Sequence, residues 1–224
     1  MNSSVVNKEI KSLIRPMLQE AGFTQFTLRT AWRYSHGQLD VISFQSFNSF
    51  LANSIGCTTY SFRVRLGCCF DAIPQSDRIK KKNGHSRPEE YQCQFRLTLQ
   101  KSIEQTNLKR TDVWYVDPTG ENLEAVIADA KKAILETGLA WFNRYSDPAE
   151  VLRTLLEDSE SNESTHGFGA KPSPIRHFFT GFVALSLGQT RLAKEHLKGA
   201  LDSGCFNEFE PKMRSELERI ENTP

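Results

Sequence analysis

Five arginines in strand-like segments are the residues of this sequence best placed to bind a partner. Each stands at a polar position of a segment in which apolar and polar residues alternate, as in a half-buried β-strand. If these strands are neighbours, the guanidinium groups share the non-core face of one sheet and could hold phosphates or carboxylates bidentately. The five are Arg29, Arg33, Arg63, Arg65 and Arg96.

A second basic group lies between two of these segments. The stretch 71–90 is rich in Pro, Gly and Ser and carries Lys80, Lys81 and Lys82, which predicts a long basic loop. With the arginines it indicates a surface for a protein partner or, alternatively, for nucleic acid. The competing interpretation is a solvated sheet face, or one that carboxylates of the C-terminal helices cover.

Other patterns that could carry chemistry are weak. The five cysteines have no Cys-x-x-Cys spacing and the histidines are not paired, so we expect no metal and no cofactor. Nothing singles out a catalytic nucleophile with its base, so no catalytic residue is assigned. Phe44, Phe47 and Phe50 are spaced by three and form either an exposed anchor for a partner or, as we favour, a lid over the core.

Composition is typical of a soluble globular protein. Hydrophobic residues make up 38% of the 224 residues, enough for a sizeable core, and the net charge of +1 gives no global attraction to nucleic acid or membranes. The first ten residues do not resemble a secretory signal, and the uncharged run 41–62 is too polar for a membrane span. We expect a cytoplasmic protein with free thiols.

The elements that must position these residues can be read from periodicity. Apolar residues at helical spacing predict a first helix, which Pro16 should bend or divide, and His36-Gly37 predicts a hairpin. Asp147-Pro148 and Ser173-Pro174 predict two further helix starts. The predicted ranges are helices at 4–21 and 123–138, strands at 26–34, 39–45, 60–70 and 91–99, and helices from 174 to the end.

These elements predict an α+β fold. A four- or five-stranded antiparallel sheet should carry helices on one face, and a small helical subdomain should follow. The predicted division is a sheet domain at 1–157, a linker or mobile loop at 158–172, and the helical subdomain at 173–224.

Residues 5–145 resemble a family of mostly bacterial domains known only as a domain of unknown function (DUF4304-like). The resemblance implies fold context and assigns no activity. It rests on the order and spacing of short pieces: the first helix running into Gly22-Phe23, Trp32 with Arg33, the strand ending in residues 43–46, the strand 62–67, the strand 93–97, and Trp114 before the helix from Leu123.

The helical pair at 174–204 looks like a single tetratricopeptide unit. Gly181, Ala193 and Ala200 fall at the small-residue spacing of that motif, where two helix backbones cross closely. The motif's late proline is replaced by Cys205, and an ordinary helical hairpin is the simpler interpretation. A single unit cannot bury its own face, so the pair must pack on the last helix or on the sheet.

From the sequence we therefore expect a non-enzymatic interaction module. It should bind a protein partner through the arginine face, the C-terminal helices or both. The alternatives are a nucleic-acid-binding protein that uses the same face with Lys80 to Lys82, and an enzyme of unknown type.

Overall fold

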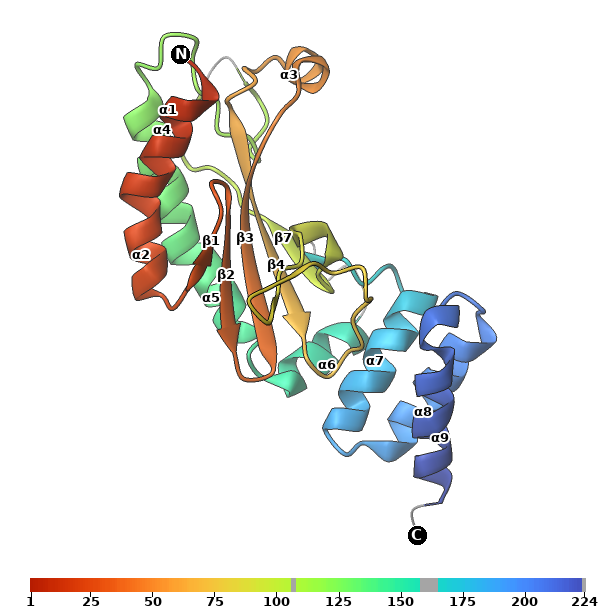
Figure 1. The fold of residues 1–224 in the computed structure, drawn as a ribbon. Helices are drawn as coiled ribbons and strands as arrows, with labels where there is room; N and C mark the ends of the chain where they lie inside the picture. Colours follow the sequence, from red (N-terminus) through yellow and green to blue (C-terminus); the bar gives the residue numbers. More distant parts are fainter. Residues whose placement is uncertain (106–107, 158–164, 223–224) are drawn as a thin grey trace.

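The computed structural model of the chain describes residues 1–105, 108–157 and 165–222, and its centre is a six-stranded antiparallel sheet (Figure 1). The predicted α+β class is confirmed. The sheet has six strands instead of four or five because both end strands span two residues, too few for an alternation pattern. In sheet order the strands are β1 (Gln25–Phe26), β2 (Thr30–Ser35), β3 (Gln38–Ser46), β4 (Phe62–Phe70), β7 (Phe95–Thr98) and β8 (Thr165–His166).

The first predicted strand, 26–34, is in fact two strands. A tight turn separates β1 from β2, and the N–H of Thr27 donates to the carbonyl of Thr30 across it at 2.8 Å. The predicted hairpin between β2 and β3 is confirmed. Its loop is His36-Gly37, and Gly37 has φ +81°, a conformation that glycine adopts readily and that a side chain would disfavour.

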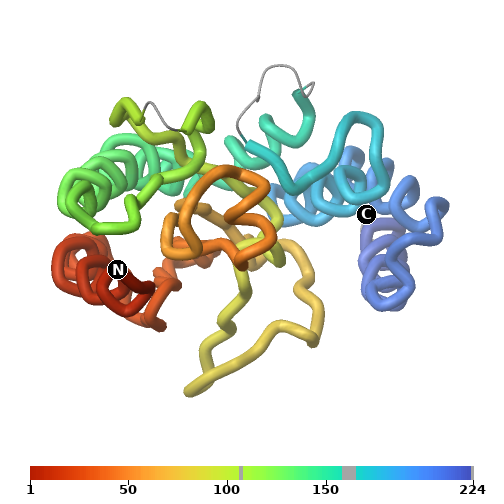
Figure 2. Tube along the Cα trace, turned by 90° about the horizontal axis from the view of Figure 1, so that it is seen from above, coloured from red at the N-terminus to blue at the C-terminus, as the bar shows by residue number. Residues whose placement is uncertain are grey.

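Helices from both ends of the first 144 residues cover one face of the sheet, and Figure 2 shows the red and green segments lying together there. The first group is α1 (Ser3–Glu9), the π-helical turn η1 (Ile10–Ile14) and α2 (Arg15–Glu20). The second is α4 (Leu123–Ala133), the π-helical turn η3 (Ile134–Gly138) and α5 (Leu139–Arg144).

Each π-helical turn marks a departure from a regular helix. In the first group the N–H of Arg15 donates to the carbonyl of Ile10, and this wider turn precedes Pro16, which has no N–H to offer. The predicted helix end at Gly138 is wrong, because the chain continues helically into α5. The Leu66 and Leu99 side chains lie close against this glycine, where a Cβ would be 3.3 Å from Leu66 Cδ1 and 3.6 Å from Leu99 Cδ1.

The other face of the sheet is also apolar and is covered by residues 71–94. A second buried cluster on this face joins Trp32, Leu39, Val41, Cys69 and Cys93. The covering segment contains the small hairpin of β5 (Lys81–Lys82) and β6 (His85–Ser86) and the 3-10 helix η2 (Glu90–Gln92). The indole N–H of Trp32 donates to the carbonyl of Pro88 at 2.9 Å, which fixes this segment on the sheet.

The strand predicted at 91–99 is therefore wrong in its first half. Tyr91 belongs to η2 and is 64% exposed, and regular pairing begins only at Phe95. Between β3 and β4, where no element was predicted, the chain forms the short helix α3 (Ser49–Ile55). Phe44 and Phe47 are buried, as expected of a lid, whereas Phe50 on α3 is 78% exposed.

Beyond α5, the described residues form four α-helices. Both predicted helix starts are confirmed: the Asp147 carboxylate accepts from the N–H of Ala149 at 2.9 Å, and the Ser173 hydroxyl accepts from the N–H of Arg176 at 3.2 Å. The helices are α6 (Pro148–Leu156), α7 (Pro174–Ser186), α8 (Thr190–Asp202) and α9 (Glu210–Glu221), with the 3-10 turn η5 (Asn207–Phe209) before the last.

Of the linker predicted at 158–172, residues 158–164 lie outside the described residues. The next residues pack against the sheet: Thr165 and His166 pair with β7 as β8, and Phe168 is buried, whereas residues 169–172 are exposed. Arg176 is buried beside this stretch and donates to the carbonyls of Glu157 at 2.7 Å and Gly169 at 2.9 Å. One continuous buried cluster extends from α1 to α9. Within the described residues, no helix has the length and apolar character needed to cross a membrane.

Candidate functional site

The five arginines do not share one face of the sheet. Arg63, Arg65 and Arg96 lie on the face that residues 71–94 cover. Arg33 lies on the opposite, helix-covered face, with its guanidinium 5.3 Å from the ring of Phe23 and 5.5 Å from that of Phe142. The expectation of a shared arginine face is therefore wrong for Arg33, because both faces of this sheet are apolar at its centre and alternation alone does not tell them apart.

Arg33 is paired with a buried carboxylate that the sequence did not single out. Its Nε lies 2.7 Å from Oδ2 of Asp40, whose side chain is fully buried. Burial raises the pKa of Asp40, although the charge of Arg33 opposes the shift. Gln38 donates to the same carboxylate and, at 3.2 Å, to the carbonyl of Phe142, so this group ties the sheet to α5.

Arg29 lies in the turn between β1 and β2 and also faces inward. Its Nε donates to the side-chain oxygen of Asn7 on α1. Burial lowers the pKa of this guanidinium. Arg29 therefore joins the hairpin to the first helix and takes no part in a sheet-face site.

Arg65 and Arg96 converge on one internal carboxylate, that of Glu90 in η2. Arg96 Nε lies 2.8 Å from Glu90 Oε1, and Arg65 Nη1 lies 3.2 Å from Oε2. Gln45 donates to the same Oε2 at 3.3 Å, and the Glu90 side chain is fully buried. The arginine face is thus covered by a carboxylate, but one from the segment 71–94 and not from the C-terminal helices.

Arg63 has its own internal partner. Its Nε lies 3.3 Å from Oδ2 of Asp112, and Arg110 donates to both oxygens of that carboxylate at 2.8 Å. Burial would raise the pKa of Asp112, but the hydrogen bonds from Arg110 and the charges of Arg110 and Arg63 outweigh it and lower the pKa. The ring of Phe47 lies 5.0 Å from the Arg63 guanidinium.

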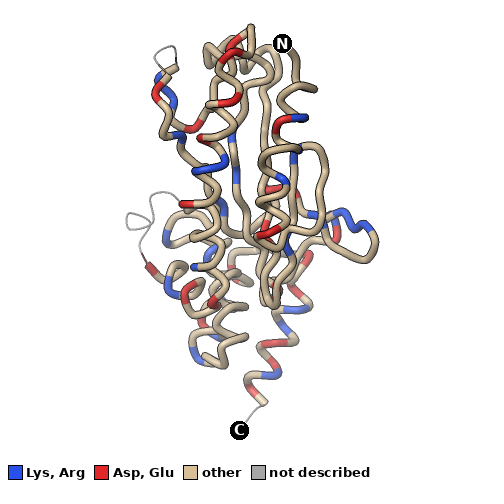
Figure 3. The backbone as a smooth tube through the Cα atoms, turned by 90° about the vertical axis from the view of Figure 1, so that its left-hand side faces the viewer, with Lys and Arg blue, Asp and Glu red and all other residues tan. Residues whose placement is uncertain are grey.

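The predicted basic loop is the part of this region that stays open. Lys80, Lys81 and Lys82 are exposed and form no ion pair with any residue that the structure describes. The turn of their hairpin is Asn83-Gly84, with φ of +52° and +80°. Figure 2 shows the segment extending away from the sheet, and Figure 3 shows the run of basic residues at its end.

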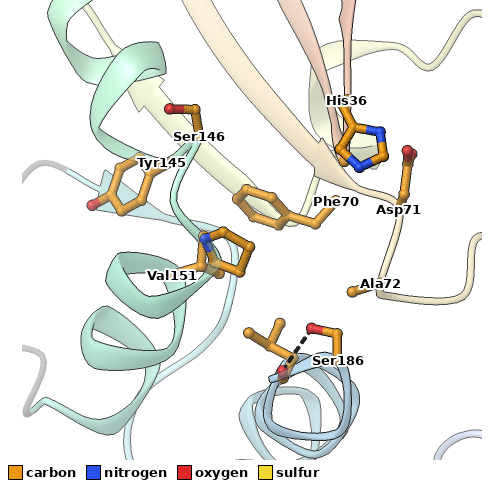
Figure 4. A pocket seen from close by; sticks show the side chains of 11 residues that line it. His36, Phe70, Asp71, Ala72, Tyr145, Ser146, Val151 and Ser186 are labelled. Atoms are coloured by element: carbon orange, nitrogen blue, oxygen red, sulfur yellow. Dashed lines mark hydrogen bonds between the residues drawn. The ribbon is translucent and has the colours of Figure 1, made fainter. Parts of the chain in front are cut away.

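A pocket of about 450 Å³ opens where the sheet meets the C-terminal helices (Figure 4). Phe70 at the end of β4, Val151 of α6 and Val183 of α7 give it apolar walls. His36, Asp71 and Ser186 add polar groups, with His36 and Asp71 together on one side in Figure 4. Sequence reasoning missed this site because its walls come from four separate segments that only the fold brings together.

The described side chains form no cluster of three or more metal ligands. Among residues 1–105, 108–157 and 165–222, no three or more His, Cys, Asp or Glu side chains are grouped so as to hold a metal ion. Cys68 and Cys93 are buried, and burial raises their pKa well above the usual value, so these thiols behave as small apolar groups.

Comparison with known proteins places the first part of the chain in a family. Searches of curated proteins and of solved structures gave no match. A family model matches residues 14–144, more than half of the chain, and takes in the sheet strands β1, β2, β3, β4 and β7 from the end of η1 to the end of α5. The chain therefore belongs to the family described as Domain of unknown function (DUF4304).

Proposed function

We propose that this chain is a cytoplasmic, bacterial, non-enzymatic interaction module that holds a peptide segment of a partner protein in the pocket between the sheet and the C-terminal helices. The observation that supports it is the pocket itself, about 450 Å³ with apolar walls and a few polar groups. A concave apolar site of this size with few polar groups suits one or two apolar side chains of a partner.

The pocket is a better candidate than the arginine face. A partner carboxylate at Arg65 or Arg96 would have to compete with Glu90, which is buried and already bonded to both. By contrast, a partner side chain could enter the pocket without displacing an internal carboxylate. Its contacts with the apolar walls would be favourable because they remove apolar surface from water. The pocket also uses α7, one of the C-terminal helices that the sequence suggested as an interaction surface.

A substitution that fills the pocket tests this proposal. Ser186 lies on the pocket wall, is exposed and donates to the carbonyl of Val183 in its own helix at 2.8 Å, so Ser186→Trp should occupy the pocket without breaking packing. Ser12 is a matched control, since it is also an exposed helical serine whose hydroxyl donates three residues back. Peptides selected from a displayed library on the wild-type chain should lose at least about tenfold affinity for Ser186→Trp and none for Ser12→Trp. Equal binding to both variants would reject the pocket as the site.

Nucleic-acid binding is a second candidate, favoured by the projecting lysines. Three ammonium groups without ion partners among the described residues could contact phosphates of a nucleic acid. Fluorescence anisotropy with short labelled single- and double-stranded oligonucleotides should then show binding that weakens steeply with salt. The variant with Lys80, Lys81 and Lys82 changed to Gln should lose most of it. Absence of binding at low salt would remove this candidate.

A further inference from the structure

Two histidines face each other across the α7–α8 helix pair. His177 lies on α7 and His196 on α8, and their Nδ1 atoms are 3.0 Å apart. Both side chains are half-buried, so solvent reaches them. The ring centres are 4.8 Å apart, whereas a straight N–H···N hydrogen bond of this length would place them about 5.3 Å apart. The rings are thus turned off the line that joins the two nitrogens.

A glycine keeps the place of the His177 ring open. A Cβ on Gly199 would lie 3.0 Å from His177 Nδ1 and 3.2 Å from Cε1, closer than packed atoms normally come. Gly199 is in the interior of α8, where glycine is among the least favourable residues for helix formation. Gly199 therefore lowers the stability of α8 but leaves room for the imidazole ring of His177.

We propose that His177 and His196 chelate a divalent late transition metal through their Nδ1 atoms. Metal–imidazole distances of about 2.0–2.1 Å let one ion reach two nitrogens at this spacing with an angle of about 95° at the metal. That angle suits the tetragonal or octahedral coordination of Cu²⁺ and Ni²⁺, whereas tetrahedral Zn²⁺ would need the nitrogens about 3.3 Å apart.

The site has two protein ligands and open positions that water fills. On binding, the proton that one Nδ1 carries in the hydrogen-bonded pair moves through solvent to Nε2 of the same ring, so both Nδ1 lone pairs face the ion. The charged groups near His196 are Glu195, which favours a cation, and Lys171, which opposes it. Open positions allow a further ligand, such as a partner's side chain, to join the same ion.

Calorimetric titration of the full chain with Ni²⁺ tests the site, using untagged protein in metal-free buffer. We expect one ion per wild-type chain and at least about tenfold weaker binding in His177→Gln and in His196→Gln. His85→Gln is the control, because it removes an exposed histidine on β6, outside the pocket, and should leave binding unchanged. Equal binding in all four proteins, or none in the wild type, would overturn the assignment.

The variant Gly199→Ala keeps both histidine ligands. It tests the metal site even if His177→Gln or His196→Gln fails to fold. Gly199→Ala pushes the His177 ring from its seat, so Ni²⁺ affinity should fall several-fold while circular dichroism shows α8 intact. Electron paramagnetic resonance of the Cu²⁺-loaded wild type should show two nitrogen ligands, and that of Gly199→Ala should not. Two-nitrogen spectra from His177→Gln would contradict the proposal.

Discussion

Glu90 is fully buried although it carries a charge, and each of its carboxylate oxygens faces a different arginine. Arg65 and Arg96 keep about a fifth of their side chains exposed, so they also contact solvent. The Glu90 carboxylate on the covering segment thus holds the guanidinium groups of Arg65 and Arg96 in place on the sheet.

Glu90→Gln should therefore destabilise the chain. It removes the charge that the two guanidinium groups share and leaves them repelling each other, which we expect to lower the free energy of unfolding by about 1–3 kcal/mol. Urea denaturation measures this. Glu104→Gln is the control, since Glu104 is exposed and outside the ion pairs of the described residues. A loss no larger than in Glu104→Gln would show that the Glu90 charge contributes nothing.

The buried pair of Arg33 and Asp40 gives a pH-dependent prediction. In Arg33→Met the Asp40 carboxyl stays buried without its cation, so its already raised pKa rises further and the free energy of unfolding at pH 7 falls by about 3–5 kcal/mol. A pKa raised by folding means that the folded state binds the proton more tightly. Stability is then greatest below the unfolded-state pKa and is lost as pH rises through the folded-state pKa.

Urea denaturation of Arg33→Met between pH 4 and pH 8 should accordingly show falling stability. The double variant Arg33→Met with Asp40→Asn is the control, because it has no carboxyl to titrate. It should be more stable than Arg33→Met at pH 7 and should lack the added pH dependence. Identical pH profiles would mean that Asp40 is not the titrating group.

At the scale of elements, alternation identified β2, β3 and β4 but not which face of β2 is covered by helices. Trp32 and Ala31 are both buried, one on each face, so the hydrophobic pattern of β2 does not show which face the helices cover. Similarly, Cys93 continues the pattern of Phe95 in sequence yet lies on the opposite face. The chain turns through η2 to bring Glu90 over the arginines. The orientation of β2 and the position of Cys93 both depend on contacts between residues far apart in the sequence, which a local sequence pattern does not reveal.

The small residues of the predicted helical pair indicate that the backbones of α7 and α8 cross closely. This close crossing leads to a prediction for Gly181. A Cβ there would lie 2.7 Å from Leu197 Cδ2 and 3.1 Å from the Leu197 nitrogen. Gly181→Ala should therefore destabilise by about 1–3 kcal/mol, although alanine normally stabilises a helix interior by about 1 kcal/mol relative to glycine. Thermal and urea unfolding followed by circular dichroism measure the change.

A double-mutant cycle separates this clash from other effects. Leu197→Ala alone leaves a cavity, and the methyl group that Gly181→Ala adds would fill part of it. The loss caused by Gly181→Ala should then shrink or reverse sign in the Leu197→Ala background. Additive losses would show that the two helices are not in tight contact at this point.

At the scale of the whole molecule, the family region and the helical tail share one buried cluster. The family match ends at residue 144, yet Val151 and Val183 beyond it build the pocket together with Phe70 from the sheet. The pocket could not be foreseen from the sequence for this reason, since neither part contains it alone. A partner that uses it recognises the combination of family domain and tail.

The continuous cluster predicts that the chain unfolds as one unit. All three tryptophans lie before residue 157, and Cys205 in the tail is the one exposed thiol among the five cysteines. A fluorophore on Cys205 and the tryptophan emission should therefore report the same urea midpoint. Two separate midpoints would instead support the division into a sheet domain and an independent helical subdomain.

The turn Asn83-Gly84 makes the basic hairpin of β5 and β6 prone to a slow chemical change at Asn83. Asparagine followed by glycine in an exposed, open turn cyclises and deamidates, and asparagine is among the thermolabile residues that proteins from hot environments avoid. Each such event adds a negative charge next to Lys82 and can insert an extra methylene into the backbone at the turn. An ageing preparation would thus separate into acidic forms that differ from the original protein in this projecting hairpin.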